Sequence, residues 1–311
     1  MEQEYPLLVV LGPTASGKTK LAVRLAEALQ GELISADSRQ VFKDMDIGTG
    51  KDLKEYELNG QQIPYHLINI REAGGKYNVN EFKEDFYRVF EDLNTRKVLP
   101  ILCGGTGMYM HSIFQDHEYT AIPVNEPLRV DLRLKDIEGL RTILKSYPLE
   151  LTQHADLSSF KRLIRAIEIA EYLSHHELVA VKRPLIKPFV LGLTSDVSLR
   201  RKKILRRMEA RLEEGMIEEV KGLLEKGVDP EVLTFYGLEY KFVVAYLSGS
   251  LDYAELKLQL GIAICQFAKR QMTFFRKMEK DGVAIHWFDT DQDSDQLFEQ
   301  VMAAYIHWKT S

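Results

Sequence analysis

Short apolar runs alternate with amphipathic segments along the first 115 residues. The runs at 7–11, 32–36 and 98–102 have the length and composition of buried strands. Apolar side chains in the intervals between them recur about one helical turn apart. They are Leu21, Leu25, Ala28 and Leu29 in the first interval, and Phe82, Phe86, Phe90 and Leu93 in the second. Strands that alternate with helices predict a parallel sheet with right-handed crossovers.

The alternation lapses between residues 116 and 188, where the pattern is mainly helical. Strand-like runs return at 189–194 and 284–289, with long helical segments between them. We therefore expect an α/β fold, with a parallel sheet flanked by helices and a small, mainly helical insertion domain. Residues 1–115 and 189–311 would form the α/β core, and residues 116–188 would form the insertion.

The segment after the first predicted strand matches the pattern G-x-x-x-x-G-K-[ST] in full. Its residues are Gly12, Pro13, Thr14, Ala15, Ser16, Gly17, Lys18 and Thr19. A loop of this kind between a strand and a helix turns its N–H groups around a phosphate, and the helix adds the dipole of its N-terminus. Lys18 would neutralise a diphosphate, and the Thr19 hydroxyl would help to hold Mg²⁺. The motif predicts a P-loop NTPase-like core that binds phosphate, without saying which phosphate compound.

Polar residues also follow the next two predicted strands. Asp37 ends the strand at 32–36, and Thr106 follows the strand at 98–102. Loops at the carboxyl ends of parallel strands meet in one crevice, so these residues and the P-loop should converge. Asp37 could accept a proton there from an attacking amine or hydroxyl, cap a helix or bind magnesium. The strand at 98–102 lacks the terminal Asp that P-loop NTPases use as a second magnesium ligand, which favours a diphosphate other than that of a nucleotide.

Charge and cysteine content narrow the class of protein. The formal net charge is -5, yet the segment RRKKILRRMEAR at 200–211 carries seven bases and one acid, which leaves room for a basic face that meets a polyanion. The two cysteines, Cys103 and Cys265, lie far apart in apolar segments, which excludes a disulfide framework or a cysteine-rich zinc site. No apolar run approaches the roughly 20 residues of a membrane-spanning helix, and no signal-peptide pattern begins the chain. We expect a cytoplasmic monomer that does not associate with membranes.

Six segments, taken in order, resemble the tRNA dimethylallyltransferases, also called tRNA isopentenyltransferases or the IPP transferase family. They are GPTASGKT at 12–19, ISADSRQVFKDMDIGTGK at 34–51, PYHLINI at 64–70, CGGTGMY at 103–109, KRLIRAIEI at 161–169 and QFAKRQMTFFRK at 266–277. The likeness covers nearly the whole chain. Any one segment could match by accident, but together and in order they are highly specific.

The resemblance implies transfer of a dimethylallyl group from dimethylallyl diphosphate to N6 of adenosine 37 in tRNAs that read codons starting with U, with Mg²⁺ as the cofactor. It implies that Asp37 is the general base, that Thr106 contacts the substrates, and that the loop at 12–19 holds the donor diphosphate. The residues that it places against tRNA are Asp37, Ser38, Arg39, Gln40, Lys161, Arg162, Leu163, Ile164 and Arg165. The segment 235–240 matches a tRNA-contacting segment more loosely, and the insertion at 116–188 would grip the anticodon stem-loop.

The chain departs from the family pattern at several positions. Phe42 replaces a frequent tyrosine, Gly50-Lys51-Asp52 differs from the usual Ala-Lys-Pro, and Lys203 stands ahead of Arg207 where an arginine is expected. Lysine lacks the forked donor that arginine offers to a diphosphate, which weakens the case for Lys203 as a ligand. We expect the aromatic side chains of the last segment to be core residues and not base-stacking platforms. They are Phe267, Phe274 and Phe275.

Two alternatives to a tRNA enzyme remain. An adenylate prenyltransferase, which modifies a free nucleotide, resembles this family in its core. The insertion and the segment 37–40 favour tRNA, because a small nucleotide needs no anticodon clamp. A P-loop kinase or an ATP-gated RNA-binding module would be favoured by an acidic residue at the end of the strand at 98–102, which is missing.

Overall fold

Six strands of the described chain form one parallel sheet. The computed structural model describes residues 3–115, 118–153, 155–179 and 181–310. The strand order is β5-β2-β6-β1-β7-β8, and each pairing is parallel. In chain order the strands are β1 (Glu4–Leu11), β2 (Gly31–Ala36), β5 (Tyr65–His66), β6 (Leu99–Gly104), β7 (Leu185–Thr194) and β8 (Ile285–Asp289). The five predicted strands and the P-loop NTPase-like parallel fold are confirmed.

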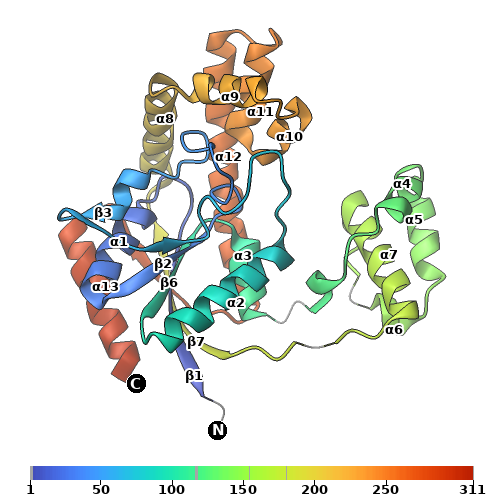
Figure 1. Cartoon of the computed structure of the whole chain (residues 1–311), viewed down its shortest axis with the longest axis horizontal. Coiled ribbons are helices and arrows are strands. Elements are labelled where there is room, and N and C mark those ends of the chain that lie inside the picture. The colour runs from blue at the N-terminus through green and yellow to red at the C-terminus, as the bar shows by residue number, and fades with distance from the viewer. Residues whose placement is uncertain (1–2, 116–117, 154, 180, 311) are drawn as a thin grey trace. The chain divides into compact units, whose positions relative to one another are not determined.

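Helices cover both faces of this sheet (Figure 1). On one face, the odd-numbered residues Leu7, Val9 and Leu11 of β1 pack with α2 (Val79–Thr95), α3 (Gly107–Phe114) and α12 (Tyr253–Lys280). On the other face, Leu8 and Val10 pack with α1 (Lys18–Leu29) and α13 (Ser294–Thr310). A strand buried on both faces needs apolar residues at every position, which explains why β1 reads as a continuous apolar run.

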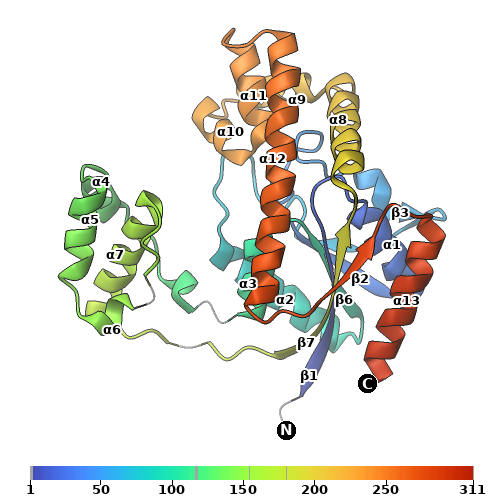
Figure 2. The same cartoon turned by 180° about the vertical axis from the view of Figure 1, so that it is seen from behind.

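A third core lies in a helical layer near the sheet edge where the strands end (Figure 2). It contains α8 (Val197–Glu213), α9 (Met216–Glu225), α10 (Pro230–Tyr236), α11 (Leu238–Leu247) and part of α12. Val41, Phe42 and Met45, from the segment after β2, are buried in the same cluster. A 3₁₀ helix, η1 (Leu53–Tyr56), and the hairpin of β3 (Glu57–Leu58) and β4 (Gln61–Gln62) lead from this segment to β5.

The chain divides into two compact units, Met1–Phe114 with Pro184–Ser311, and Gln115–Arg183. The second unit contains η2 (Glu118–Ala121), α4 (Glu126–Arg133), α5 (Ile137–Lys145), α6 (Leu149–Thr152) and α7 (Phe160–His175). Its own small core includes Leu140, Leu163 and Ile167, and the side chain of Glu168 is buried with Arg129 as its ion-pair partner.

Residues 185–188, which the sequence pattern assigned to the insertion, belong to the sheet. We expected the insertion to end at 188, but β7 begins at Leu185, and its residues 185–188 pair with Glu4–Leu7 of β1. Leu185, Lys187 and Pro188 are not an apolar run, and the first of these is 45% exposed. Backbone pairing with β1 makes this stretch a strand, and periodicity alone does not reveal such pairing.

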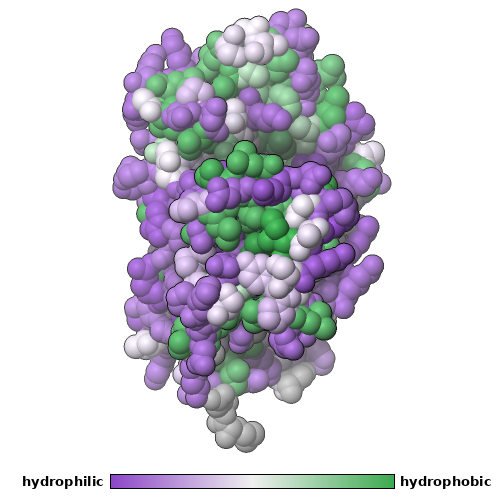
Figure 3. All heavy atoms as spheres, turned by 90° about the vertical axis from the view of Figure 1, so that its right-hand side faces the viewer, coloured by the Kyte–Doolittle hydropathy of each residue, from purple (hydrophilic) through white to green (hydrophobic). Residues whose placement is uncertain are grey.

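Hydrophilic side chains cover most of the surface seen in Figure 3, with hydrophobic ones between them. In the helical unit the exposed hydrophobic residues include Val130, Leu134 and Leu149. Within the described residues, no helix combines the length and the apolar character that crossing a bilayer requires.

Candidate active site

Three loops at the carboxyl ends of neighbouring strands border one cavity of about 710 Å³ in the α/β unit. The register places Leu11 of β1 and Ala36 of β2 beside Gly104 of β6, so the three strands end level with one another. The P-loop, Asp37 and Thr106 all line this cavity. The predicted convergence is therefore present, and it follows from parallel pairing in this order.

The P-loop is shaped to bind an anion. Ala15 and Gly17 have left-handed φ angles of 60° and 78°, which turn successive N–H groups toward one side. A Cβ atom at Gly12 would lie 2.7 Å from Ser16 Oγ, so only glycine allows this close turn. Ser16 Oγ is buried and has no hydrogen-bond partner among the described residues, as expected of a donor reserved for a bound group.

Basic side chains line the same cavity. Lys18 begins α1, and Lys203, Arg207 and Arg211 come from α8. Burial lowers the pKa of the Lys18 ammonium, and the two arginines lower it further, whereas Cys103 and Asp37 oppose the shift. Confined positive charges of this kind favour a bound diphosphate, which would also raise the Lys18 pKa again.

Asp52 contacts two of these cations. Its carboxylate pairs with Arg207 and, at 3.3 Å, with Arg211. The pairing keeps both guanidinium groups in place beside the cavity. Lys203 lies 3.4 Å from Asp291, so its ammonium already has a carboxylate partner.

Asp37 and Thr106 are held at the cavity wall by backbone hydrogen bonds. Asp37 Oδ1 accepts from Arg39 N at 2.9 Å, which fixes the carboxylate at the end of β2. Thr106 Oγ1 accepts from Ser38 N at 3.1 Å and lies 3.5 Å from Ser38 Oγ. The loops after β2 and β6 are thereby joined directly, and Asp37 and the P-loop line the same cavity.

Arg39 and Gln40 extend the same wall. Arg39 lies over the ring of Phe235, 5.5 Å from its centroid, and burial lowers the Arg39 pKa. Gln40 donates from Nε2 to the Gly50 carbonyl at 3.2 Å and accepts from Ser35 Oγ at 2.9 Å. Residues 234–241 also line the cavity, so the loosely matched segment 235–240 does reach the site.

Gln271, for which the sequence pattern predicts no role, joins two of the loops. Its Oε1 accepts from Thr14 N and its Nε2 donates to the Gly105 carbonyl, both at 2.9 Å. The residue is only 8% exposed, on the α12 face that also buries Ala268 and Phe275. The sequence does contain one sign of this role: Gln271 lies among apolar residues that recur at helical spacing. A buried amide needs hydrogen-bond partners, so such a residue is expected to contact other polar groups.

The expectation that three aromatic residues of α12 are core residues is wrong for Phe267, while Phe274 is partly buried against the core. Phe275 is a core residue with no exposure, as expected. Phe267 is instead 42% exposed, and both it and Phe274 line the cavity. Phe267 and Phe274 are seven residues apart and so share a face of α12, while Phe275 points about 100° away from Phe274. Helical spacing alone does not tell which face meets a cavity.

The predicted contact residues at 161–165 lie on α7 in the helical unit. Lys161 and Arg162 are exposed, and Arg162 pairs with Asp156 at 2.6 Å. Leu163 and Ile164 are buried in the core of that unit, so their side chains hold α7 and offer no surface to a partner. Arg165 donates to the carbonyl groups of Tyr119 and Ile122 at 2.9 and 2.7 Å.

The fold and this site together define a P-loop protein in which the P-loop and a carboxylate line one large cavity. Comparison with known proteins then assigns the family: the model described as IPP transferase matches residues 40–278, and the chain belongs to that family.

Named relatives agree with this assignment. The chain is 50% identical over 300 residues to tRNA dimethylallyltransferase 1 of Parabacteroides distasonis, covering 96% of this chain and 97% of the relative. It is 51% identical over 288 residues to tRNA dimethylallyltransferase 1 of Azobacteroides pseudotrichonymphae, covering 92% and 94%. The full-length tRNA isopentenylpyrophosphate transferase of Bacillus halodurans has a similar structure, with a TM-score of 0.71, 30% identity and coverage of 98% of each chain.

Proposed function

We propose that this protein transfers a dimethylallyl group from dimethylallyl diphosphate to N6 of an adenosine in tRNA. The observation that carries the proposal is the placement of Asp37 and Lys18 on the wall of one cavity. A donor diphosphate on the P-loop and a purine beside Asp37 could meet there. The names of the relatives, which describe dimethylallyl transfer to tRNA, support the same reaction.

The reaction needs a developing charge to be stabilised and a proton to be removed. The bond between C1 of the dimethylallyl group and the diphosphate oxygen breaks, and the diphosphate leaves with the electron pair. The P-loop N–H groups, Lys18 and Arg207 would stabilise that anion. N6 of the adenine forms the new bond to C1, and its proton passes to the Asp37 carboxylate.

A magnesium ion fits this site only with help from the substrate. Among the described residues, no three His, Cys, Asp or Glu side chains gather in a way that could hold a metal. Magnesium in phosphate sites takes most of its ligands from phosphate oxygens and water. Thr19 lines the same cavity as Ser16, whose Oγ has no partner among the described residues, and the Thr19 hydroxyl would be the protein ligand of the ion. When bound, the ion would neutralise charge on the diphosphate.

We also propose which base of the tRNA reacts. We place the reacting base at adenosine 37 of tRNAs that read codons starting with U, by resemblance to the family. A base in a stacked anticodon loop must be flipped out to enter a cavity, which the volume of about 710 Å³ allows. The exposed basic residues Lys161 and Arg162 support a role for the helical unit in holding the anticodon stem-loop.

Label transfer tests this function. Labelled dimethylallyl diphosphate should modify unmodified tRNA and leave AMP almost unlabelled. Preferred labelling of AMP would instead identify an adenylate prenyltransferase, and transfer from ATP with no use of the prenyl donor would identify a kinase.

Substitution of the proposed base tests the mechanism. Asp37→Asn keeps the hydrogen bond from Arg39 N but removes the proton acceptor. We expect kcat to fall at least about 100-fold, the usual contribution of a general base, with tRNA affinity within about threefold of the unaltered protein. The exposed Asp44→Asn is the matched control. Equal turnover in the two variants would remove Asp37 from this role.

A further inference from the structure

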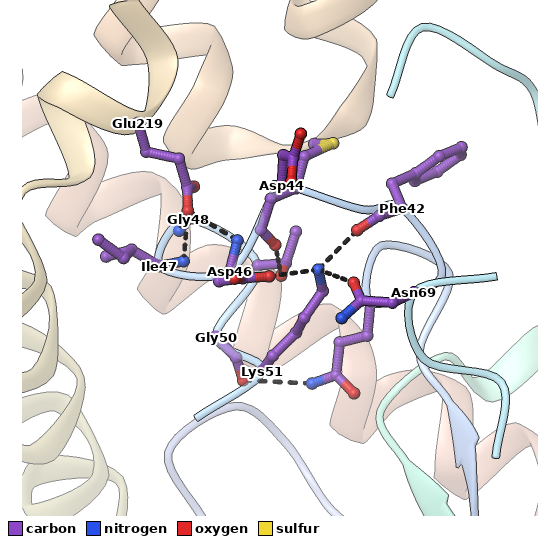
Figure 4. Close-up of polar contacts among 12 residues, drawn as sticks. Phe42, Asp44, Asp46, Ile47, Gly48, Gly50, Lys51, Asn69 and Glu219 are labelled. Atoms are coloured by element: carbon purple, nitrogen blue, oxygen red, sulfur yellow. Dashed lines mark hydrogen bonds and ion pairs between the residues drawn. The ribbon is translucent and has the colours of Figure 1, made fainter. Parts of the chain in front are cut away.

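The segment 41–51, which we call the 41–51 loop, is held by a buried lysine. The Lys51 side chain has no exposed surface. Its ammonium donates to the Phe42 carbonyl at 2.6 Å, to Asp46 Oδ1 at 2.6 Å and to Asn69 Oδ1 at 2.5 Å (Figure 4). An ammonium has three N–H donors, so every donor of Lys51 is used within or beside this loop.

Glu219, on α9, holds the same loop from the other side. Its carboxylate accepts from three successive backbone N–H groups, those of Asp46 and Ile47 at 2.7 Å and Gly48 at 3.0 Å (Figure 4). It also accepts from the Tyr240 hydroxyl at 2.7 Å. Successive N–H groups converging on one anion form a strong, geometrically specific site, and charge-assisted hydrogen bonds are about twice as strong as neutral ones.

The packing around these bonds leaves the loop little freedom. A Cβ atom at Gly48 would lie 2.7 Å from the Tyr240 ring, and one at Gly50 would lie 1.8 Å from Arg211 Nη2. The loop backbone is therefore pressed against side chains from α8 and α11. Its position depends on helices more than 150 residues away along the chain.

Near the end of the 41–51 loop, the Gly50 carbonyl accepts a hydrogen bond from the Gln40 side chain and orients it. The Gly50 carbonyl can only accept a hydrogen bond, so it sets the Gln40 Nε2 atom on its own side and the Oε1 atom toward Ser35 Oγ. One N–H of Nε2 and one lone pair of Oε1 then remain for a ligand. Gln40 and Gly48–Gly50 line the cavity, and a glutamine amide presents the donor and acceptor pair that matches an adenine edge.

We infer that Lys51 and Glu219 are positioning residues for the acceptor nucleobase. They fix the 41–51 loop so that the Gly50 carbonyl presents the Gln40 amide to the base in one orientation. This inference rests on the proposed function, because it takes the ligand beside Gln40 to be an adenine. We place the donor diphosphate mainly on the P-loop, which Gln271 holds through Thr14 N and the Gly105 carbonyl.

Steady-state kinetics of the full chain test the inference, with labelled dimethylallyl diphosphate and unmodified tRNA varied in turn. The variants are Lys51→Met and Glu219→Gln. Lys226→Met is the control for the lysine, because it breaks an exposed ion pair between the C-terminal end of α9 and Asp44 of the same loop. Glu218→Gln, at an exposed neighbouring position on α9, is the control for the glutamate.

We expect kcat/KM for tRNA to fall about tenfold or more in both variants, while KM for the donor changes less than about threefold. The controls should stay within about twofold of the unaltered protein. Circular dichroism gives the folded fraction of each sample, and Glu219→Gln keeps the side-chain volume in case Lys51→Met folds poorly.

Three results would overturn the inference: activity of the variants equal to that of the controls, loss only in proportion to the folded fraction, or a rise in donor KM with tRNA KM unchanged. If the unaltered protein itself transfers no label to tRNA, the proposed function fails instead.

Discussion

Removing the amide of Gln271 should loosen the contact between the P-loop and the loop after β6. Gln271→Met keeps the length of the side chain but leaves the Thr14 N–H and the Gly105 carbonyl without their partner. A buried polar group left unpaired costs about 1–3 kcal/mol. Thr14 is partly buried and water can reach part of its surface, so we expect a total loss of about 2–4 kcal/mol. At about 2 °C per kcal/mol for a chain of this size, Tm would fall by about 4–8 °C.

The same substitution should weaken donor binding, because Thr14 N belongs to the phosphate-binding loop. Thermal unfolding gives the stability change, and KM for dimethylallyl diphosphate, expected to rise about tenfold, gives the effect on the site. Gln266→Met, at an exposed position on the same helix, is the matched control. If Gln271→Met matches this control in both Tm and donor KM, the hydrogen bonds of Gln271 do not hold the two loops, and the reasoning fails.

Three further changes have measurable outcomes. Gly50→Ala should lower stability by about 1–2 kcal/mol, since φ is +65° and the new Cβ atom meets Arg211; a denaturant titration with an unchanged midpoint would contradict this. Glu32, whose pKa is lowered to about 2 mainly by its hydrogen bond from Arg96, should stabilise the fold above its unfolded pKa of about 4.5, and this stability is lost as the pH falls from there toward 2. Glu32→Gln should therefore flatten the pH dependence of unfolding in that range, and an unaltered slope would refute the assignment. Burial raises the pKa of the Cys103 thiol to about 12, so iodoacetamide at pH 8 should alkylate it far more slowly in the folded protein than in urea; equal rates by peptide mass spectrometry would show that the thiol is accessible.

Local pattern was enough to predict the sheet and the phosphate loop. A strand buried on both faces is mostly apolar, so 7–11 and 98–102 were readable as strands, and 32–36 was readable despite Glu32 and Ser35. The P-loop is a local motif whose glycines and lysine act within eight residues, so its position between a strand and a helix followed from the sequence. Convergence of Asp37 and Thr106 on that loop was predictable because the carboxyl ends of parallel strands lie at one edge of the sheet, and the strand order then made them neighbours.

The sequence pattern could not predict which distant segments contact each other, and only the tertiary structure shows these contacts. Gln271 meets Thr14 across 257 residues of chain, and Glu219 meets the 41–51 loop across more than 170. Whether Phe267 faces a cavity or the core depends on how α12 is rotated against its neighbours, which no spacing of apolar residues encodes. The sequence by itself determined which loops carry the P-loop motif and the carboxylate, because those properties reside in local residue type and order. Packing between helices and loops determined how these groups are held, because hydrogen bonds of that kind depend on three-dimensional distance and not on order along the chain.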